Sequence, residues 1–298
     1  MANIRLFRTT NGKVQEIKGE SAPLEKSLQV QFERNLLDFL GVTFLASEYS
    51  TGKTHGGRID SLGIDENNCP VIVEYKKAIN ENVINQGLFY LNWLQDHREA
   101  FELLVLEKLG RNKSKEIFWD SPRLICIAGD FTKYDKHAVE QINANIDLIR
   151  YKRFGDDLIM LEHINSSIAD SSPAVPSLGK YKTVGEQLET ADQEMKDLFE
   201  ALRTMLMGFG DDVQMKEMKY YFAFKRLSNF ACVEIKNQAK KLLVYVKVDP
   251  ESIQLEEGFT RDVRRIGHYG TGDLEITIKS THDISKAREL LQMSYDNS

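Results

Sequence analysis

The chain has 298 residues, of which 42% are hydrophobic and 28% are charged, and its formal net charge is -6. This composition is typical of a globular protein, and no apolar run approaches the ~18–20 residues that cross a bilayer. Three scattered cysteines (Cys69, Cys126 and Cys232) argue against a disulfide framework or a thiolate zinc site. The acidic balance disfavours a protein that coats nucleic acid by charge alone, although a local basic cleft or a bound cation would still permit contact.

The N-terminal sequence MANIRLFRTTNGK lacks the apolar core of a secretion signal. We therefore expect a cytoplasmic protein without a membrane partner. The length favours two domains, and residues 166–180 (SSIADSSPAVPSLGK) have the composition of a linker. This divides the chain into a first domain at 1–165, a linker at 166–180 and a second domain at 181–298.

The first domain is expected to begin with two short strands and an amphipathic helix. The helix starts at Ser21 and Pro23 and ends at Gly41, because leucines and Phe32 recur on one face between these signals. The elements expected after it, in chain order, are a strand at 43–47, a hairpin of strands 57–64 and 71–76, a long helix at 82–109 bent near His97, a buried strand at 123–131, a helix at 135–143, and strands at 147–152 and 157–162.

The second domain is expected to be a smaller α+β unit. Its helix at 184–207 is acidic and amphipathic, and a second helix closes the chain at 283–294. The strands between them are expected at 219–225, 230–236, 241–248 and 273–279. The predicted fold class is therefore α/β (α+β), with a mixed central sheet flanked by helices in the first domain.

Charged residues interrupt the apolar hairpin of the first domain. With its turn at 65–70, the hairpin places Asp60 roughly opposite Glu74 and Lys76. Two carboxylates brought together from neighbouring strands repel each other unless a cation lies between them. Hard oxygen ligands suit Mg²⁺ or Mn²⁺, which can activate an attacking water beside a lysine. The alternative is an exposed ion pair of Glu74 with Lys76 or Lys77.

Neighbouring residues fit the same site. Gly56 and Gly57 permit close backbone approach before Arg58, which shares a face with Asp60. On the following helix, Gln86 and Tyr90 lie on one face, continued by Trp93 and His97. Glu33, on the preceding helix, could reach the site as a further metal ligand. The alternatives are a hydrogen-bonded core glutamine for Gln86 and a solvated helix-edge charge for Glu33.

These motifs resemble the PD-(D/E)xK nuclease superfamily over residues 24–130. The similar segments are GRID, which contains Asp60, VIVEYK, which contains Glu74 and Lys76, and QGLFY, which contains Gln86 and Tyr90. The resemblance is closest to the archaeal-type endonucleases that cut mismatched or branched DNA, and it implies a restriction-endonuclease-like αβββαβ core. It also implies that Asp60 and Glu74 bind the metal, that Lys76 assists the nucleophile, and that Gln86 and Tyr90 position substrate or lysine. Ile59 stands where the family name has proline.

The second domain resembles a module labelled a predicted transport protein, of the DUF5655 type. Its basic residues Arg264 and Arg265, with Arg58 and Lys77 of the first domain, are the expected nucleic-acid contacts. Aromatic residues are interleaved with basic ones near 219–226 and could stack on bases. The alternatives are core aromatics and solvated surface charges.

The leading hypothesis is a Mg²⁺- or Mn²⁺-dependent nuclease that hydrolyses phosphodiester bonds, with DNA favoured over RNA as substrate and a homodimer possible. The alternative is a catalytically silent protein that binds nucleic acid or a partner on a nuclease-like scaffold. A weaker alternative is a soluble accessory of a transport system. The histidines show no zinc-ligand spacing, and STGKT at 50–54 lacks the first glycine of a phosphate-binding loop.

Overall fold

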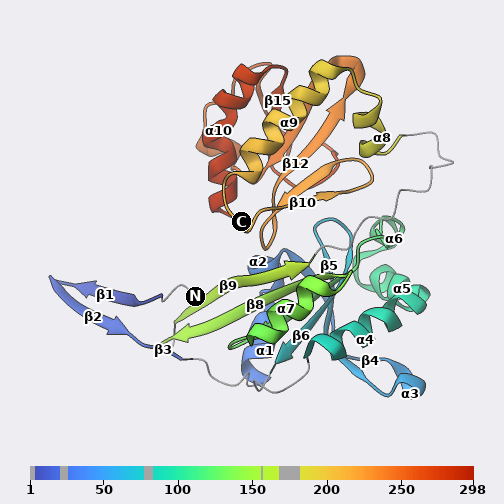
Figure 1. Cartoon of the computed structure of the whole chain (residues 1–298), viewed down its shortest axis with the longest axis vertical. Coiled ribbons are helices and arrows are strands. Elements are labelled where there is room, and N and C mark those ends of the chain that lie inside the picture. Colours follow the sequence, from blue (N-terminus) through green and yellow to red (C-terminus); the bar gives the residue numbers. More distant parts are fainter. Residues whose placement is uncertain (1–3, 21–25, 77–82, 156, 168–181) are drawn as a thin grey trace. The chain divides into compact units, whose positions relative to one another are not determined.

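The structure is a computed structural model and describes residues 4–20, 26–76, 83–155, 157–167 and 182–298. The chain divides into two compact units, Met1–Ser172 and Pro173–Ser298 (Figure 1). The division falls inside the predicted linker, most of which lies outside the described residues. Each unit has its own sheet and its own hydrophobic core.

The first unit is built on a seven-stranded mixed sheet in the order β3-β8-β7-β6-β5-β4, with β9 paired to β8. Its strands are β3 (Gly19–Glu20), β4 (Val42–Ser50), β5 (Arg58–Asp65), β6 (Pro70–Lys76), β7 (Arg123–Ala128), β8 (Asn145–Phe154) and β9 (Leu158–Ser167). Strands β6, β7 and β8 run parallel, and the other neighbours are antiparallel. A separate two-stranded ribbon, β1 (Leu6–Thr10) and β2 (Lys13–Ile17), precedes the sheet.

The helices of this unit divide two of the three predicted helices into shorter ones and match the length of the third, predicted at 135–143. They are α1 (Lys26–Arg34), α2 (Leu36–Leu40), α3 (Gly52–His55), α4 (Val83–Asp96), α5 (Arg98–Leu109), α6 (Arg111–Lys115) and α7 (Lys133–Gln141). The first predicted helix breaks at Asn35, whose side-chain amide donates to the carbonyl of Gln31 and so competes with regular helix. It ends at Gly41 in the left-handed conformation. The predicted bend near His97 is a complete break between α4 and α5.

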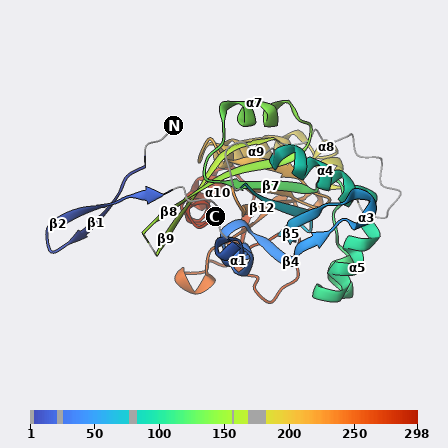
Figure 2. The same cartoon turned by 90° about the horizontal axis from the view of Figure 1, so that it is seen from below.

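Helices cover both faces of this sheet, α1 on one side and α4 and α7 on the other (Figure 2). Phe32 of α1 makes edge contacts with Tyr75 of β6 and Tyr151 of β8. On the opposite face, Gly87 of α4 lies so close to Leu124 of β7 that a β carbon there would collide with it. The central strands are therefore buried on both faces, as parallel strands usually are.

A buried charge network joins four strands at one end of the sheet. Arg123 of β7 donates to Asp65 of β5 at 3.1 Å and to Asp147 of β8 at 2.7 Å. His163 of β9 lies 3.2 Å from the second oxygen of Asp147. Asp65 also accepts the backbone N–H groups of Asn67 and Cys69, which fixes the hairpin turn between β5 and β6. Each charge in this network is hydrogen-bonded, as a buried charge must be.

The second unit is an antiparallel sheet with helices on one face. Its elements are α8 (Val184–Glu189), α9 (Gln193–Met207), β10 (Gln214–Glu217), β11 (Phe222–Lys225), β12 (Asn229–Lys236), β13 (Lys241–Val246), β14 (Thr260–Asp262), β15 (Leu274–Ile278) and α10 (Thr281–Asp296). The strand order is β10-β11-β12-β13-β15-β14. The predicted helix at 184–207 is two helices, because Asp192 caps α9 through the N–H of Met195.

The predicted α/β class is confirmed: the first unit is a mixed sheet flanked by helices, and the second is a smaller α+β unit. In chain order the first unit has α1 and α2, then strands β4, β5 and β6 with α3 after β4, then helices α4 to α6, and then β7. Across the parts of the chain that the structure describes, no helix is long and apolar enough to cross a membrane.

We expect Arg123→Ala to destabilise the first unit by about 3–5 kcal/mol, because Asp65 and Asp147 would remain buried without their cation. Urea unfolding measures this change. Arg8→Ala is the control, since Arg8 pairs with Asp157 on the exposed surface of the same unit and its loss should change stability by less than about 1 kcal/mol. A similar small effect for both variants would contradict the importance assigned to the network.

Candidate functional site

Strands β5 and β6 stop pairing regularly at the predicted acidic residues. Their ladder includes Ser61 opposite Val73 and Leu62 opposite Ile72, and Asp60 and Glu74 are the next residues in this register. At that point side chains replace backbone carbonyls as acceptors. The N–H of Asp60 donates to Glu74 Oε1 at 3.1 Å, and the N–H of Tyr75 donates to Asp60 Oδ2 at 3.0 Å. The structure therefore brings Asp60 and Glu74 together between the two strands.

Glu74 is 1% exposed. The pKa of its carboxyl is raised to about 9, mainly by burial and then by the charge of Asp60, with a smaller rise from Glu48, against the lowering effect of the Asp60 N–H. A carboxyl buried beside a like charge keeps its proton at neutral pH unless a cation compensates it. Such perturbed groups concentrate at functional sites.

The oxygen set of this pair suits a hard divalent cation with water in its remaining positions. A divalent cation would compensate the repulsion between these two carboxylates, of which Glu74 is buried and Asp60 is partly buried. Among the described residues, however, no three His, Cys, Asp or Glu side chains lie close enough together to hold a metal ion. With the side chains as they lie in this structure, Asp60 and Glu74 are therefore the two carboxylates that could bind a cation here.

Gln86 and Tyr90 lie together on α4, next to the start of β5. Gln86 Nε2 donates to the Tyr90 hydroxyl at 3.2 Å, and the N–H of Arg58 donates to the same hydroxyl at 3.1 Å. A β carbon on Gly57 would lie 2.5 Å from the Tyr90 ring. The glycine thus permits the tyrosine to dock on the strand that carries Asp60. Tyr90 is buried, whereas Gln86 is exposed.

Trp93 and His97 follow Gln86 and Tyr90 along the chain, but their rings belong to an aromatic cluster and not to the acid pair. Their rings stack at 4.6 Å, and Tyr49 and His55 contact them. This cluster belongs to the packing of α4 against β4 and α3.

Glu33 does not join the acid pair in the structure. Its Oε1 accepts hydrogen bonds from Ser61 at 2.7 Å, Ser47 at 2.8 Å and Gln29 at 3.0 Å. Gln29 also donates to the backbone carbonyl of Asp60 at 3.4 Å. These contacts connect Glu33 to the strands beside the pair, and none of them is to either carboxylate of the pair.

The predicted basic residues of the first unit are described in part. Arg58 is exposed and pairs with Glu48 at 3.3 Å. Lys76 ends β6, but its side chain and the whole of Lys77 lie outside the described residues. The role expected for Lys76 therefore remains a prediction.

In the second unit, the guanidinium of Arg264 is surrounded by acids. It contacts Asp262 at 2.8 Å, Glu251 at 3.0 Å and Asp249 at 3.7 Å. Arg265 beside it is exposed. The structure therefore does not present Arg264 as an unpaired cation for phosphate, although the sequence suggested it as one.

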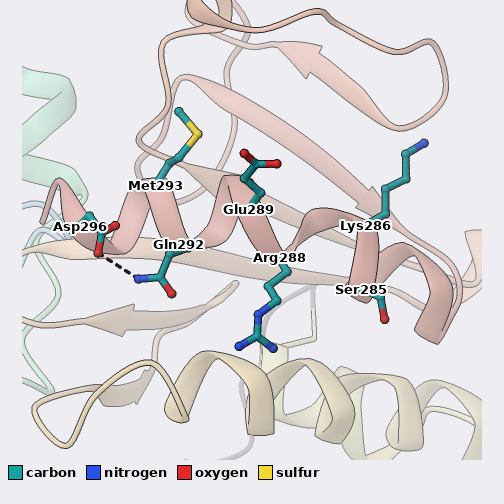
Figure 3. Close-up of a pocket in the computed structure, with 7 residues that line it drawn as sticks. All are labelled: Ser285, Lys286, Arg288, Glu289, Gln292, Met293 and Asp296. Atoms are coloured by element: carbon teal, nitrogen blue, oxygen red, sulfur yellow. Dashed lines mark hydrogen bonds between the residues drawn. The ribbon is translucent and has the colours of Figure 1, made fainter.

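A hollow also lies along α10, lined by seven residues of that one helix (Figure 3). Gln292 donates to Asp296 at 2.9 Å within it, while Arg288 and Glu289 are exposed. These side chains belong to the surface of a single helix and include no buried ionisable group. The acid pair between β5 and β6 is the better candidate for chemistry.

Residues 184–298 match the family model described as a domain of unknown function, DUF5655. Over 309 aligned residues the chain is 28% identical to an uncharacterized protein of Haemophilus influenzae, and the similarity covers 98% of this chain and 99% of the relative. No solved structure matches the chain significantly. The second unit is therefore similar to a known domain type, and both units are present in a bacterial relative.

We expect the protein without added metal to lose stability as pH rises from about 4.5 to about 9, through the window in which folded Glu74 keeps its proton. The unfolded chain releases that proton near the ordinary glutamate pKa, so higher pH favours unfolding, by up to about 1.4 kcal/mol per pH unit. Glu74→Gln should flatten this part of the profile. Unfolding in urea at a series of pH values tests this, and equal slopes for both proteins would contradict a raised pKa for Glu74 in the folded protein.

Gly57→Ala should push Tyr90 off β5 and destabilise the first unit by about 1–3 kcal/mol. Gly267→Ala is the control, because a β carbon there meets no atom within 4 Å. Thermal unfolding compares the two variants. Equal melting temperatures would show that the close contact between Gly57 and the Tyr90 ring does not contribute to stability.

Proposed function

We propose that the protein is a metal-dependent nuclease whose site is formed by Asp60 and Glu74. The observation that carries this proposal is the convergence of two carboxylates, one of them 1% exposed, at the point where β5 and β6 separate. An ordinary hairpin would continue its backbone ladder here. The motif resemblance and the order of elements around the hairpin support the same function.

Each residue of the proposed site has a separate role. Asp60 and Glu74 would hold Mg²⁺ or Mn²⁺, an ion that polarises a phosphoryl oxygen and lowers the pKa of a bound water. Tyr90 fixes the backbone before Asp60 through the N–H of Arg58, and Gln86 holds the Tyr90 hydroxyl. Lys76, two residues beyond Glu74, would orient the attacking water and offset developing negative charge. Arg58, 67% exposed, would contact a phosphate of the substrate.

DNA is the proposed substrate on the strength of the resemblance. The second unit, which matches a domain of unknown function, is proposed to recognise substrate or partner. A pairing of two copies would allow both strands of a duplex to be cut.

The purified full-length protein should cleave at least one of a panel of single-stranded, duplex, mismatched and branched DNA substrates with Mg²⁺ or Mn²⁺. Asp60→Asn and Glu74→Gln should each lower the cleavage rate by a factor of about 100 or more, because each removes a charge that the transition state needs. Gel electrophoresis of labelled substrates measures the rates, and EDTA should abolish them.

Glu107→Gln on α5 is the control and should leave cleavage unchanged, since Glu107 is an exposed helix residue with no role in the proposed site. Activity that survives both Asp60→Asn and Glu74→Gln would refute the site. A wild-type protein that binds Mn²⁺ through Asp60 but cleaves no DNA or RNA would instead favour the catalytically silent scaffold.

A further inference from the structure

The ribbon formed by β1 and β2 (Figure 1) is exposed along almost its whole length. Its turn consists of Asn11 and Gly12, which have positive φ values of 52° and 76°. This is the conformation of a type I′ turn, for which Asn-Gly is a preferred sequence. Every residue from 7 to 16 is exposed, and Leu6 and Ile17 at the base are partly buried. The sequence therefore builds a regular ribbon that covers no core.

A ribbon of two strands is marginally stable by itself in water. The printed contacts between this ribbon and the rest of the first unit lie toward its base. Arg8 is 3.5 Å from Asp157, and a β carbon on Gly155 would lie 3.9 Å from Ile17. The exposed part between these contacts and the turn gains no burial from its own unit. A binding partner is therefore the better explanation for a ribbon of this regularity.

The two faces of the ribbon differ in chemistry. Arg8 is opposite Gln15, and Thr10 is opposite Lys13. Because side chains alternate along a strand, these four lie on one face, which we call the polar face. It carries two cations and two hydrogen-bonding side chains, and it contains no acid.

The opposite face uses its charge within the ribbon. Arg5 pairs with Glu16 at 2.8 Å, and its guanidinium lies 5.0 Å from the centre of the Phe7 ring. On the polar face, by contrast, Lys13 makes no ion pair with a described residue. Arg8 has the one partner Asp157, and these two side chains are 58% and 67% exposed. Exposed pairs of this kind contribute little to stability, so both cations of the polar face are available to an anionic partner.

The polar face suits the major groove of duplex DNA. This groove is about 12 Å wide and admits a two-stranded β-ribbon, and arginine, lysine and glutamine read its base edges. Strands of five residues extend about 17 Å, which corresponds to about five base pairs. Residues 4–18 carry four cations and one acid, in a chain whose net charge is -6. The ribbon is thus a basic element of an acidic protein.

The ribbon begins at the end of the sheet that carries the acid pair. Strands β6, β7 and β8 run parallel, so their carboxyl ends lie at one end of the sheet. Glu74 is close to the end of β6. Strand β3, which follows the ribbon, places Gly19 opposite Phe154 at the end of β8. A duplex bound at the acid pair would therefore approach the same end of the sheet as the ribbon.

We propose that the β1–β2 ribbon enters the major groove of duplex DNA with its polar face toward the base edges. Arg8 and Gln15 would donate to base edges, and Lys13, beside the turn, would contact a phosphate. Arg8 would exchange the exposed Asp157 for the nucleic acid. The choice of DNA rests on the proposed function, and the ribbon adds that the substrate is a duplex.

The test is binding of a labelled DNA duplex to the full-length protein in EDTA, followed by fluorescence anisotropy. Arg8→Gln combined with Lys13→Gln should weaken binding at least about tenfold. The slope of log affinity against log salt concentration should fall by about 2, because each lost phosphate contact removes about 0.9. These positions are exposed, and circular dichroism checks that the fold is unchanged.

Lys108→Gln combined with Arg111→Gln is the matched control. It removes the same charge from exposed positions of the first unit outside the ribbon and should change affinity by less than about threefold. Val14→Thr alters the opposite face of the ribbon and should leave affinity unchanged. Equal losses for the two double variants would show an effect of overall charge and overturn the proposal.

Duplex RNA of the same sequence tests the groove itself. Its major groove is deep and too narrow for side chains to read. It should therefore bind more weakly than the DNA, and the ribbon variant should lose less than about threefold on it. Equal losses on both duplexes would contradict insertion into the major groove.

The remaining outcomes separate the ribbon from the proposed nuclease. A wild-type protein that binds no duplex in EDTA overturns the role of the ribbon. So does a ribbon variant that binds DNA like wild type, including one in which light scattering shows a dimer become a monomer, since the ribbon would then join two copies. If binding depends on the ribbon but wild type cleaves no DNA or RNA, the nuclease fails and the ribbon stands. If cleavage depends on Asp60 but the ribbon variant binds and cleaves like wild type, the ribbon fails alone.

Discussion

The structure depends on how the backbone is satisfied where β5 and β6 separate. An N–H group that leaves a ladder inside a protein needs another acceptor. Here the carboxylates of Glu74 and Asp60 accept the N–H groups of Asp60 and Tyr75. The two acids thus hold the open end of the hairpin, and this forces them to approach each other. A proton on Glu74 relieves their mutual repulsion, and under the proposed function a cation would take the place of that proton.

The surrounding elements fix this point from several sides. Tyr90 of α4 accepts from the backbone just before Asp60, and Gln29 of α1 donates to the carbonyl of Asp60 itself. At the turn end of the hairpin, Arg123 binds Asp65 to Asp147. Because β5 is held at both ends, the spacing of the acid pair is set by the whole sheet. Precise placement on rigid strands is what a catalytic or metal site requires.

Much of this arrangement could be predicted from local sequence. The hairpin follows from alternating apolar residues around DENNCP, and its register alone places Asp60 near Glu74. The position of Glu33 could not be predicted in this way. Small differences in how the helix packs on the sheet decide whether its carboxylate reaches the acid pair or, as in the structure, the hydroxyl of Ser61. The pairing of β4 with β5 could not be predicted either, because its register shifts between Phe44 and Ala46. A bulge of that kind leaves no reliable sequence signal.

The second unit shows why a basic cluster in a sequence is weak evidence for nucleic-acid contact. Arg264 is bound by three acids, Arg261 pairs with Glu275 at 2.8 Å, and Lys236 pairs with the buried Glu234. The acids on the same sheet face also raise the pKa of Tyr245, after burial as the main cause. These cations neutralise the charges of their own unit, so a phosphate backbone would have to compete with carboxylates for them. Under the proposed function, the phosphate contact is therefore assigned to Arg58, whose side chain is 67% exposed and whose partner Glu48 is 37% exposed.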